Sequence, residues 1–199
     1  MSRFRILDAY LARLPAGLDS YPEYVGKASI ARSVIDGWPG IVALAPELPE
    51  ALRRFVEAPP PGTVWVPEVH SEALWLLALE ARCDGDPMRF ERWSYEVNRA
   101  LLAQPLYRAV FGVLGARLTV RAIGAAWSTF HRGLTQDVDV VGTTGTITLH
   151  GPAHLMPAEL APSYATAYRA GLAVAGITSS RAETAEVTPT SMRFRVAWG

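Results

Sequence analysis

The chain has 199 residues, of which 50% are hydrophobic and 19% are charged, and its formal net charge is +0. This balance is typical of a folded globular protein and excludes a disordered one, and the lack of a basic surplus argues against a protein that binds nucleic acid. The one cysteine, Cys83, excludes an internal disulfide and any multi-thiolate metal site within one chain, and it fits the reducing cytoplasm, where we expect the protein to reside.

The first 134 residues are predicted to be helical. Apolar residues recur three and four positions apart, as Phe4, Leu7 and Leu11 do, and turns rich in proline and glycine end each segment. Residues 59–62, three prolines and a glycine, form the strongest break, which we interpret as a loop inside one domain because about sixty residues would make a marginal domain. The predicted helices span residues 4–14, about 20–36, 49–57, 67–82, 87–103, 106–114 and 116–134.

The predicted helix 67–82 places Val69, Leu74 and Leu77 on one side. Glu68 and Glu72 fall elsewhere on the helix, and we expect Glu72 to be exposed. The most apolar run of the chain lies within this helix but is far shorter than the roughly 20 residues that cross a bilayer. We therefore expect no membrane span.

The last third of the chain is predicted to form two β-hairpins. Residues 136–149 are rich in Val, Ile and Thr and are broken once, at 142–145, where two glycines allow a turn. Residues 184–198 end in a strict alternation of apolar and polar side chains, with a turn near 189–190. Alternation of this kind predicts strands with one buried face and one solvated face.

A helix is predicted between the two hairpins. Regular helix should begin near Pro162, which suits the first helical turn, after a looser turn. Leu160, Tyr164, Tyr168 and Leu172 are four positions apart and so form one apolar stripe. This stripe should face the protein interior.

These patterns predict an α+β fold in a single domain, residues 1–199. An N-terminal multi-helix layer, residues 1–134, would pack on a small C-terminal antiparallel sheet. The sheet would come from the hairpin–helix–hairpin part, residues 135–199.

Two short histidine motifs resemble metal sites, but we interpret their residues as structural. His70-Ser71-Glu72 has the His-x-Glu spacing of zinc deaminases, but the Pro-Cys-x-x-Cys segment that would complete such a site is missing. His150 and His154 are four apart, but Gly151 and Pro152 place them in a loop, and no third metal ligand is evident, so two exposed histidines are favoured. We therefore predict no metal site.

Two further features have both a structural and a functional interpretation. Asp137 and Asp139 point to the same side of a predicted edge strand, where charges that block aggregation are commoner than an acid–base pair. His131 lies at the seam between an apolar and an arginine-rich helix face, where it could line a pocket, act as a base or cap the helix. Trp65, between the proline run and Pro67, could mark a contact surface.

Standard catalytic motifs are missing. The sequence has no Gly-x-Ser-x-Gly elbow, no Walker-type loop and no Gly-x-Gly-x-x-Gly. Whether the protein is an enzyme is not decided by the sequence, but the lack of a complete catalytic set favours a non-enzymatic domain. We predict no cofactor.

Several segments together resemble an uncharacterised family of proteins from myxobacteria. The resemblance covers most of the chain and implies origin and length but no catalytic residue. The segments that carry it are Gly17-Leu-Asp-Ser-Tyr-Pro22, Lys27-Ala-Ser29, Val66-Pro-Glu-Val-His70, Asn98-Arg-Ala-Leu-Leu102, Pro105-Leu-Tyr-Arg108, Ala126-Trp127 and Phe130-His-Arg-Gly133.

A more distant resemblance is architectural. Helices followed by hairpin, helix and a terminal strand that ends in an aromatic residue resemble the α+β domain of haem-NO-binding sensors, 4-vinyl-reductase domains and TRAPP-type subunits. That resemblance implies a small hydrophobic ligand, haem, an acyl chain or dimerisation. The chain lacks the Tyr-x-Ser-x-Arg signature of the haem sensors and the cysteine cluster of the vinyl-reductase type, which argues against haem and zinc and leaves an apolar pocket.

Three functional hypotheses follow. The first is a non-enzymatic ligand-binding, signalling or adaptor domain that holds a small apolar ligand between helices and sheet, with Trp127, His131, Tyr164 and Tyr168 as ligand-binding residues; packed core is the alternative for all four. The second is an enzyme with a dispersed site in which His131 or His70 acts as a base with a nearby carboxylate. The third is a structural module that forms a homodimer or binds a protein partner through a sheet edge.

Overall fold

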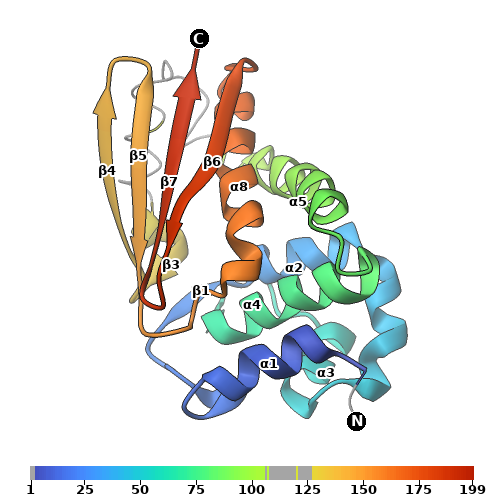
Figure 1. Ribbon diagram of the computed structural model, residues 1–199. Helices are drawn as coiled ribbons and strands as arrows, with labels where there is room; N and C mark the ends of the chain where they lie inside the picture. The colour runs from blue at the N-terminus through green and yellow to red at the C-terminus, as the bar shows by residue number, and fades with distance from the viewer. Residues whose placement is uncertain (1–2, 106, 108–119, 121–126) are drawn as a thin grey trace.

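The computed structural model describes residues 3–105, 107, 120 and 127–199, and it is an α+β structure in which helices pack against an antiparallel sheet (Figure 1). The described helices are α1 (Arg5–Arg13), α2 (Ala28–Gly37), α3 (Glu50–Glu57), α4 (Glu68–Leu77), α5 (Pro87–Leu102) and α8 (Ala161–Val174). The described strands are β1 (Val25–Lys27), β2 (Trp65–Pro67), β3 (His131–Arg132), β4 (Thr135–Val141), β5 (Thr144–His150), β6 (Ser180–Val187) and β7 (Ser191–Trp198). The α+β prediction is confirmed.

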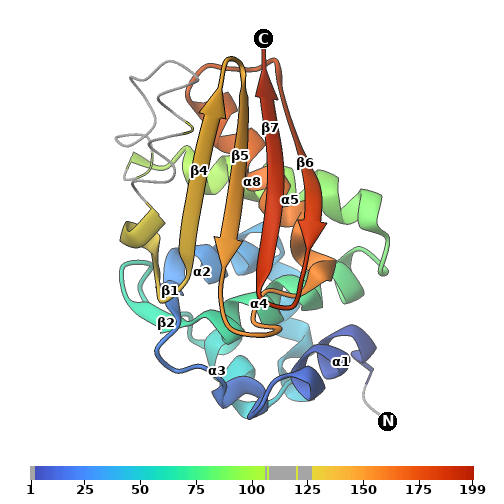
Figure 2. The ribbon, with the colours of Figure 1, turned by 60° about the vertical axis from the view of Figure 1, so that its left-hand side comes forward.

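Four strands form the larger sheet in the order β4-β5-β7-β6, and every neighbouring pair is antiparallel. Ile147 of β5 pairs with Phe194 of β7, and both side chains are fully buried. Thr146 and Arg195, one position along, pair on the opposite face, which is the side seen in Figure 2. Both hairpins were predicted because period-two alternation places one face of a sheet in the core; the second begins at Ser180, four residues earlier than expected.

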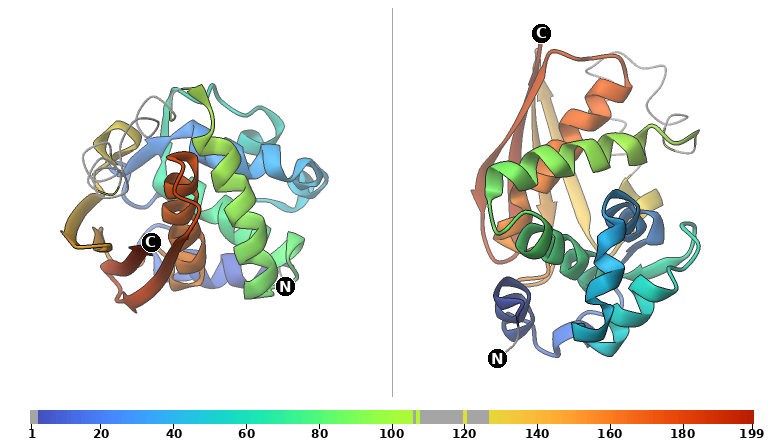
Figure 3. Two further views of the ribbon diagram at one scale, coloured as in Figure 1. Left: turned by 90° about the horizontal axis from the view of Figure 1, so that it is seen from above. Right: turned by 90° about the vertical axis from the view of Figure 1, so that its right-hand side faces the viewer.

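Helix α8 lies against β6 and β7, and α5 crosses α8 on its other side (Figure 3). The crossing includes a buried polar contact: the Asn98 amide of α5 donates to the Ser163 carbonyl and the Thr166 hydroxyl of α8, each at 3.1 Å. Helix α8 begins at Ala161, after a 3-10 turn at Ala158–Leu160. This agrees with the start near Pro162, after a looser turn, that the sequence predicts. The layers are therefore sheet, α8 and α5.

Helix α4 is the centre of the helical part. Nine of its ten residues are buried, including Glu68 and Glu72. A helix that is buried on all sides has no solvent face on which to place a charge. The expectation that Glu72 is exposed is therefore wrong.

A second, three-stranded sheet, β2-β1-β3, lies beside α4. Val25–Lys27 pairs with Trp65–Pro67 on one side and with His131–Arg132 on the other. The predicted helix over residues 20–36 is therefore wrong in its first half: Tyr21 has φ 53°, and regular helix begins only at Ala28.

The predicted helices 106–114 and 116–134 lie largely outside the described residues. Residues 127–130 are helical, but His131–Arg132 is a strand, so the prediction of helix through residue 134 is wrong at its end. The cross-strand pairing of His131 with Gly26 explains the change. None of the described helices combines the length and the apolar character that a membrane span requires.

Candidate functional site

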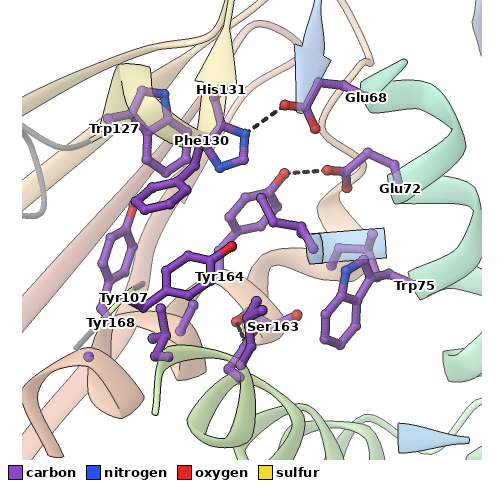
Figure 4. Close-up of a pocket in the computed structure, with 17 residues that line it drawn as sticks. Glu68, Glu72, Trp75, Tyr107, Trp127, Phe130, His131, Ser163, Tyr164 and Tyr168 are labelled. Carbon is purple, nitrogen blue, oxygen red and sulfur yellow. Dashed lines mark hydrogen bonds and ion pairs between the residues drawn. The ribbon is translucent and has the colours of Figure 1, made fainter. Parts of the chain in front are cut away.

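A pocket lies between α4, α5, α8 and residues 127–131, with a cavity of about 140 Å³ (Figure 4). Its lining is mainly apolar, with leucines from α5 and a small residue, Ala167, from α8. Six aromatic residues also line it: Trp75, Tyr107, Trp127, Phe130, Tyr164 and Tyr168. A cavity of about 150 Å³ with apolar walls can hold a benzene-sized group.

The four residues predicted to bind a ligand, Trp127, His131, Tyr164 and Tyr168, all line this one pocket. They come from two segments about thirty residues apart in sequence, the stretch before and including β3 and the buried stripe of α8. The described lining contains no residue of β4–β7, so the pocket lies between helices and not in the helix–sheet seam where it was predicted. Their contact with a ligand stays a prediction.

A histidine–glutamate pair forms one wall of the pocket. His131 Nδ1 lies 2.6 Å from Glu68 Oε1, and the two side chains are 11% and 2% exposed. The Glu68 carboxylate lies against β1: a Cβ placed on Gly26 would be 2.7 Å from its Oε1. On its other side the imidazole stacks on the Trp127 ring, with ring centroids 3.9 Å apart. Strand pairing, stacking and the carboxylate together fix the orientation of the His131 ring.

A second carboxylate lies one helical turn further along α4. The Tyr164 hydroxyl donates to Glu72 Oε1 at 2.5 Å. Burial raises the pKa of Glu72 to about 8; the hydrogen bond from Tyr164 opposes this shift and the nearby Glu68 adds to it. At neutral pH the Glu72 carboxyl is therefore largely protonated, in contrast to an ordinary surface glutamate.

Two polar atoms of pocket residues are buried without a hydrogen-bond partner: Glu72 Oε2 and the Tyr168 hydroxyl. Figure 4 shows the Tyr164 and Tyr168 rings extending from α8 toward the space beside α4. A buried polar atom without a partner costs about 1–3 kcal/mol, so such atoms are rare in folded proteins. Burial also raises the pKa of the Tyr168 phenol, so this group is neutral and can donate.

The described lining contains two carboxylates and one histidine but neither lysine nor arginine. The arrangement can bind an apolar group against the aromatic rings and a polar group at Glu72 and Tyr168. No described group of three or more His, Cys, Asp or Glu side chains is arranged to hold a metal ion.

The other candidate residues lie away from this pocket. His70 and Glu72 share α4, but residues two apart on a helix do not face each other, and only Glu72 lines the pocket. His150 Nε2 lies 3.0 Å from Asp137 Oδ2 on the outside of the sheet, with side chains 47% and 81% exposed. Asp139 is exposed on the edge strand β4, and His154 has φ 64° in a loop.

Trp65 was predicted to be exposed enough to mark a contact surface, but its side chain is half-buried. The Lys27 ammonium lies 3.9 Å and the Arg132 guanidinium 4.0 Å from the centre of its ring. Both cations therefore contact the ring, and this indole is already engaged within the chain.

Glu68 and Glu72 were not predicted as pocket residues, because both lie off the apolar side of the predicted helix. One signal was available. Residues 73–79 are apolar on every side of the helix, and a helix of this kind is buried all round, so carboxylates on its preceding turn must face an interior space.

No protein-family model matches the chain, and no curated protein matches it. The chain is similar to a solved structure, that of a mutant of the H-NOX of T. Tengcongensis, with a TM-score of 0.54 and 6% sequence identity. The similarity covers 85% of this chain and 93% of that chain. At this identity it shows the fold alone, which is the haem-NO-binding type of architecture that the sequence distantly resembles. The resemblance to myxobacterial proteins stays a prediction.

Proposed function

We propose that the protein is a non-enzymatic domain that binds a small, mainly apolar ligand in the pocket between α4, α5 and α8, and that ligand binding serves a signalling or adaptor role. The likeness of the fold to that of an H-NOX domain supports a small-ligand-binding or signalling domain. The ligand would contact Trp127, Tyr164 and Tyr168, beside the oriented His131 ring.

The observation that carries this proposal is the combination of an aromatic cavity with polar atoms that lack partners. A cavity formed only by imperfect packing would be lined by apolar groups, because unpaired polar atoms destabilise the fold. Here Glu72 Oε2 and the Tyr168 hydroxyl are both buried and unpaired. A ligand with one polar end would satisfy them and would place its apolar part against the rings.

Haem does not fit the described lining. The two propionates of haem are anionic, and cationic side chains usually bind such groups. The described lining offers Glu68 and Glu72 and no lysine or arginine. A cavity of about 140 Å³ is also smaller than the 300–1,000 Å³ or so typical of pockets for drug-sized ligands. The expected ligand is therefore a smaller molecule.

Filling the cavity tests the proposal. Ala167 lines the pocket from α8, so Ala167→Leu should remove the space and abolish binding of any compound found by thermal shift and native mass spectrometry of a small-molecule library. Ala173→Leu is a matched control, since Ala173 is also half-buried on α8 but is not part of the described lining. A library that yields no ligand for the wild-type protein, or hits that bind Ala167→Leu unchanged, would contradict the proposal.

One observation favours an enzyme as the second candidate. His131 is hydrogen-bonded to Glu68, and an oriented histidine–carboxylate pair is the usual arrangement of a general base. The His131 side chain is only 11% exposed, so a substrate would have to enter the pocket to reach it. If a hydrolytic or proton-transfer activity is detected, His131→Ala should reduce it by roughly 100-fold or more, whereas an unchanged rate would exclude this base.

A further inference from the structure

The described lining has the electrostatic character of a cation site. It contains two carboxylates and several aromatic rings, and none of its described residues is a lysine or arginine. The faces of aromatic rings attract cations because their π-systems carry negative charge density. The described lining offers an anionic ligand no cationic side chain to pair with.

The two carboxylates differ in whether an oxygen atom is still available to pair with a ligand. Glu68 Oε1 is occupied by His131 Nδ1 and the carboxylate lies against Gly26. Glu72 has a phenol hydroxyl on one oxygen and nothing on the other. Glu72 Oε2 is therefore the one carboxylate oxygen in the described lining that is known to lack a partner.

The size of the cavity limits the apolar part of the ligand. About 140 Å³ accommodates a single six-membered ring with a short substituent. A polar end on that ring would have to reach Glu72 or Tyr168 to pair with the unpaired atoms.

We propose, on the basis of the function proposed above, that the pocket binds a small lipophilic amine, whose ammonium group is held by the Glu72 carboxylate and whose ring packs among Trp127, Tyr164 and Tyr168. The Tyr168 hydroxyl would accept a further hydrogen bond from the ammonium group. Tyr164 would continue to donate to Glu72 Oε1 and so orient the carboxylate.

Binding of this kind transfers a proton to solvent. Burial raises the pKa of the empty Glu72 carboxyl to about 8, so at neutral pH it carries a proton. A primary alkylamine is protonated at neutral pH, as lysine is. When the ammonium enters, Glu72 loses its proton to the buffer, and the pair in the pocket is carboxylate and ammonium with no net change in pocket charge.

Several other titratable groups face Glu72. Glu68 lies on the same helix, Tyr164 on α8 and Tyr10 on α1, and His131 reaches the region through Glu68. Burial raises the pKa of both tyrosines well above the ordinary value, so neither titrates near neutral pH. Proton release should therefore approach one per ligand near pH 6.5 and fall steadily between pH 7 and pH 9, as Glu72 ionises in the free protein.

The test compares four ligands of one size by isothermal titration calorimetry: benzylamine, benzyl alcohol, toluene and benzoate. We expect benzylamine to bind at least about tenfold more tightly than the two neutral compounds, and benzoate not to bind. Titration of benzylamine in two buffers of different ionisation enthalpy should give a proton release near one at pH 6.5. Toluene or benzyl alcohol binding as tightly as benzylamine would overturn the amine assignment and leave the proposed ligand-binding function in place.

A variant isolates the carboxylate. Glu72→Gln keeps the shape and can still accept from Tyr164, so benzylamine should bind roughly 10- to 100-fold more weakly, with no proton release. Glu91→Gln, an exposed α5 position outside the described lining, is the control and should behave as wild type. Unchanged benzylamine affinity in Glu72→Gln, or no proton release by the wild-type protein, would overturn the inference. If the Glu72 variant does not fold, the two-buffer measurement on wild type still decides.

Discussion

Two histidine–carboxylate pairs lie in different surroundings. Glu68–His131 is almost fully buried in the wall of an aromatic pocket, whereas Asp137–His150 joins β4 to β5 on the surface. The surface pair is solvated and screened, so its removal should matter little. In the buried pair each group depends on the other, because a polar group left alone in the interior cannot turn to water. The burial of a histidine–carboxylate pair therefore determines how much its loss destabilises the protein.

The largest expected effect is a pH dependence of the free energy of unfolding, and it comes from Glu72. This buried carboxyl group has no histidine partner, unlike Glu68 and Asp137. Burial raises the pKa of Glu72 from 4.5 to about 8, so between these values the folded protein holds a proton that the unfolded chain has released. The free energy of unfolding should fall as the pH rises from about 5 to 8, by up to about 1.4 kcal/mol per pH unit and on the order of 4 kcal/mol in all. Urea unfolding across pH 5–9 measures it.

The control for this experiment is Glu72→Gln, which removes the titrating group and should flatten the decline. At pH 9 this variant should be more stable than wild type, because wild type then contains a buried carboxylate. Because other groups such as His70 also titrate in this range, the difference between the two proteins is decisive: the same pH dependence in Glu72→Gln and wild type would show that Glu72 does not hold a proton in the folded state.

Breaking the buried pair should have the next largest effect. Glu68→Ala leaves His131 without its partner and leaves a void under β1, so we expect a loss of about 3 kcal/mol in the free energy of unfolding at pH 7. Urea unfolding monitored by tryptophan fluorescence is suitable because Trp127 stacks on His131. A loss below about 1 kcal/mol would contradict the view that the pair is interdependent.

A smaller effect is expected where β1 approaches the pair. In Gly26→Ala the new Cβ would lie 2.7 Å from Glu68 Oε1, so the carboxylate or the strand must shift, at a cost of about 1–2 kcal/mol. A double-mutant cycle with Glu68→Ala identifies the cause, because removal of the carboxylate removes the clash. The double variant should therefore lose less than the sum of the single losses, and strict additivity would show that Gly26 acts elsewhere.

The smallest effect is expected on the surface. Asp137→Ala breaks the pair with His150 but should change the free energy of unfolding by no more than about 0.5 kcal/mol, and by less still in 1 M salt. A loss as large as that of Glu68→Ala would remove the distinction between the two pairs.

The sequence predicted the hairpins and α8 well because their signals are local. Alternation near Phe194 and the four-residue spacing of Tyr164 and Tyr168 report directly which side of each element is buried. The four predicted residues line one pocket because each lies on the buried side of its segment, but the pocket lies between helices and not between helices and the larger sheet.

The short strands could not be predicted in this way. Val25–Lys27 and Trp65–Pro67 have three residues each, too few for a period, and their pairing joins segments about forty residues apart. The position of His131 depends on the same pairing, so its contact with Glu68 was also not predictable. The burial of Glu72 was indicated only indirectly, by the apolar run that follows it.

The most direct test of the pocket as the site of a small lipophilic amine is a crystal structure of the protein grown with benzylamine. We expect the ring in the cavity beside Trp127 and Tyr168, with the amine nitrogen within about 3.2 Å of a Glu72 carboxylate oxygen. A pocket that stays free of the compound at saturating concentration, or a compound seated elsewhere on the chain, would contradict it.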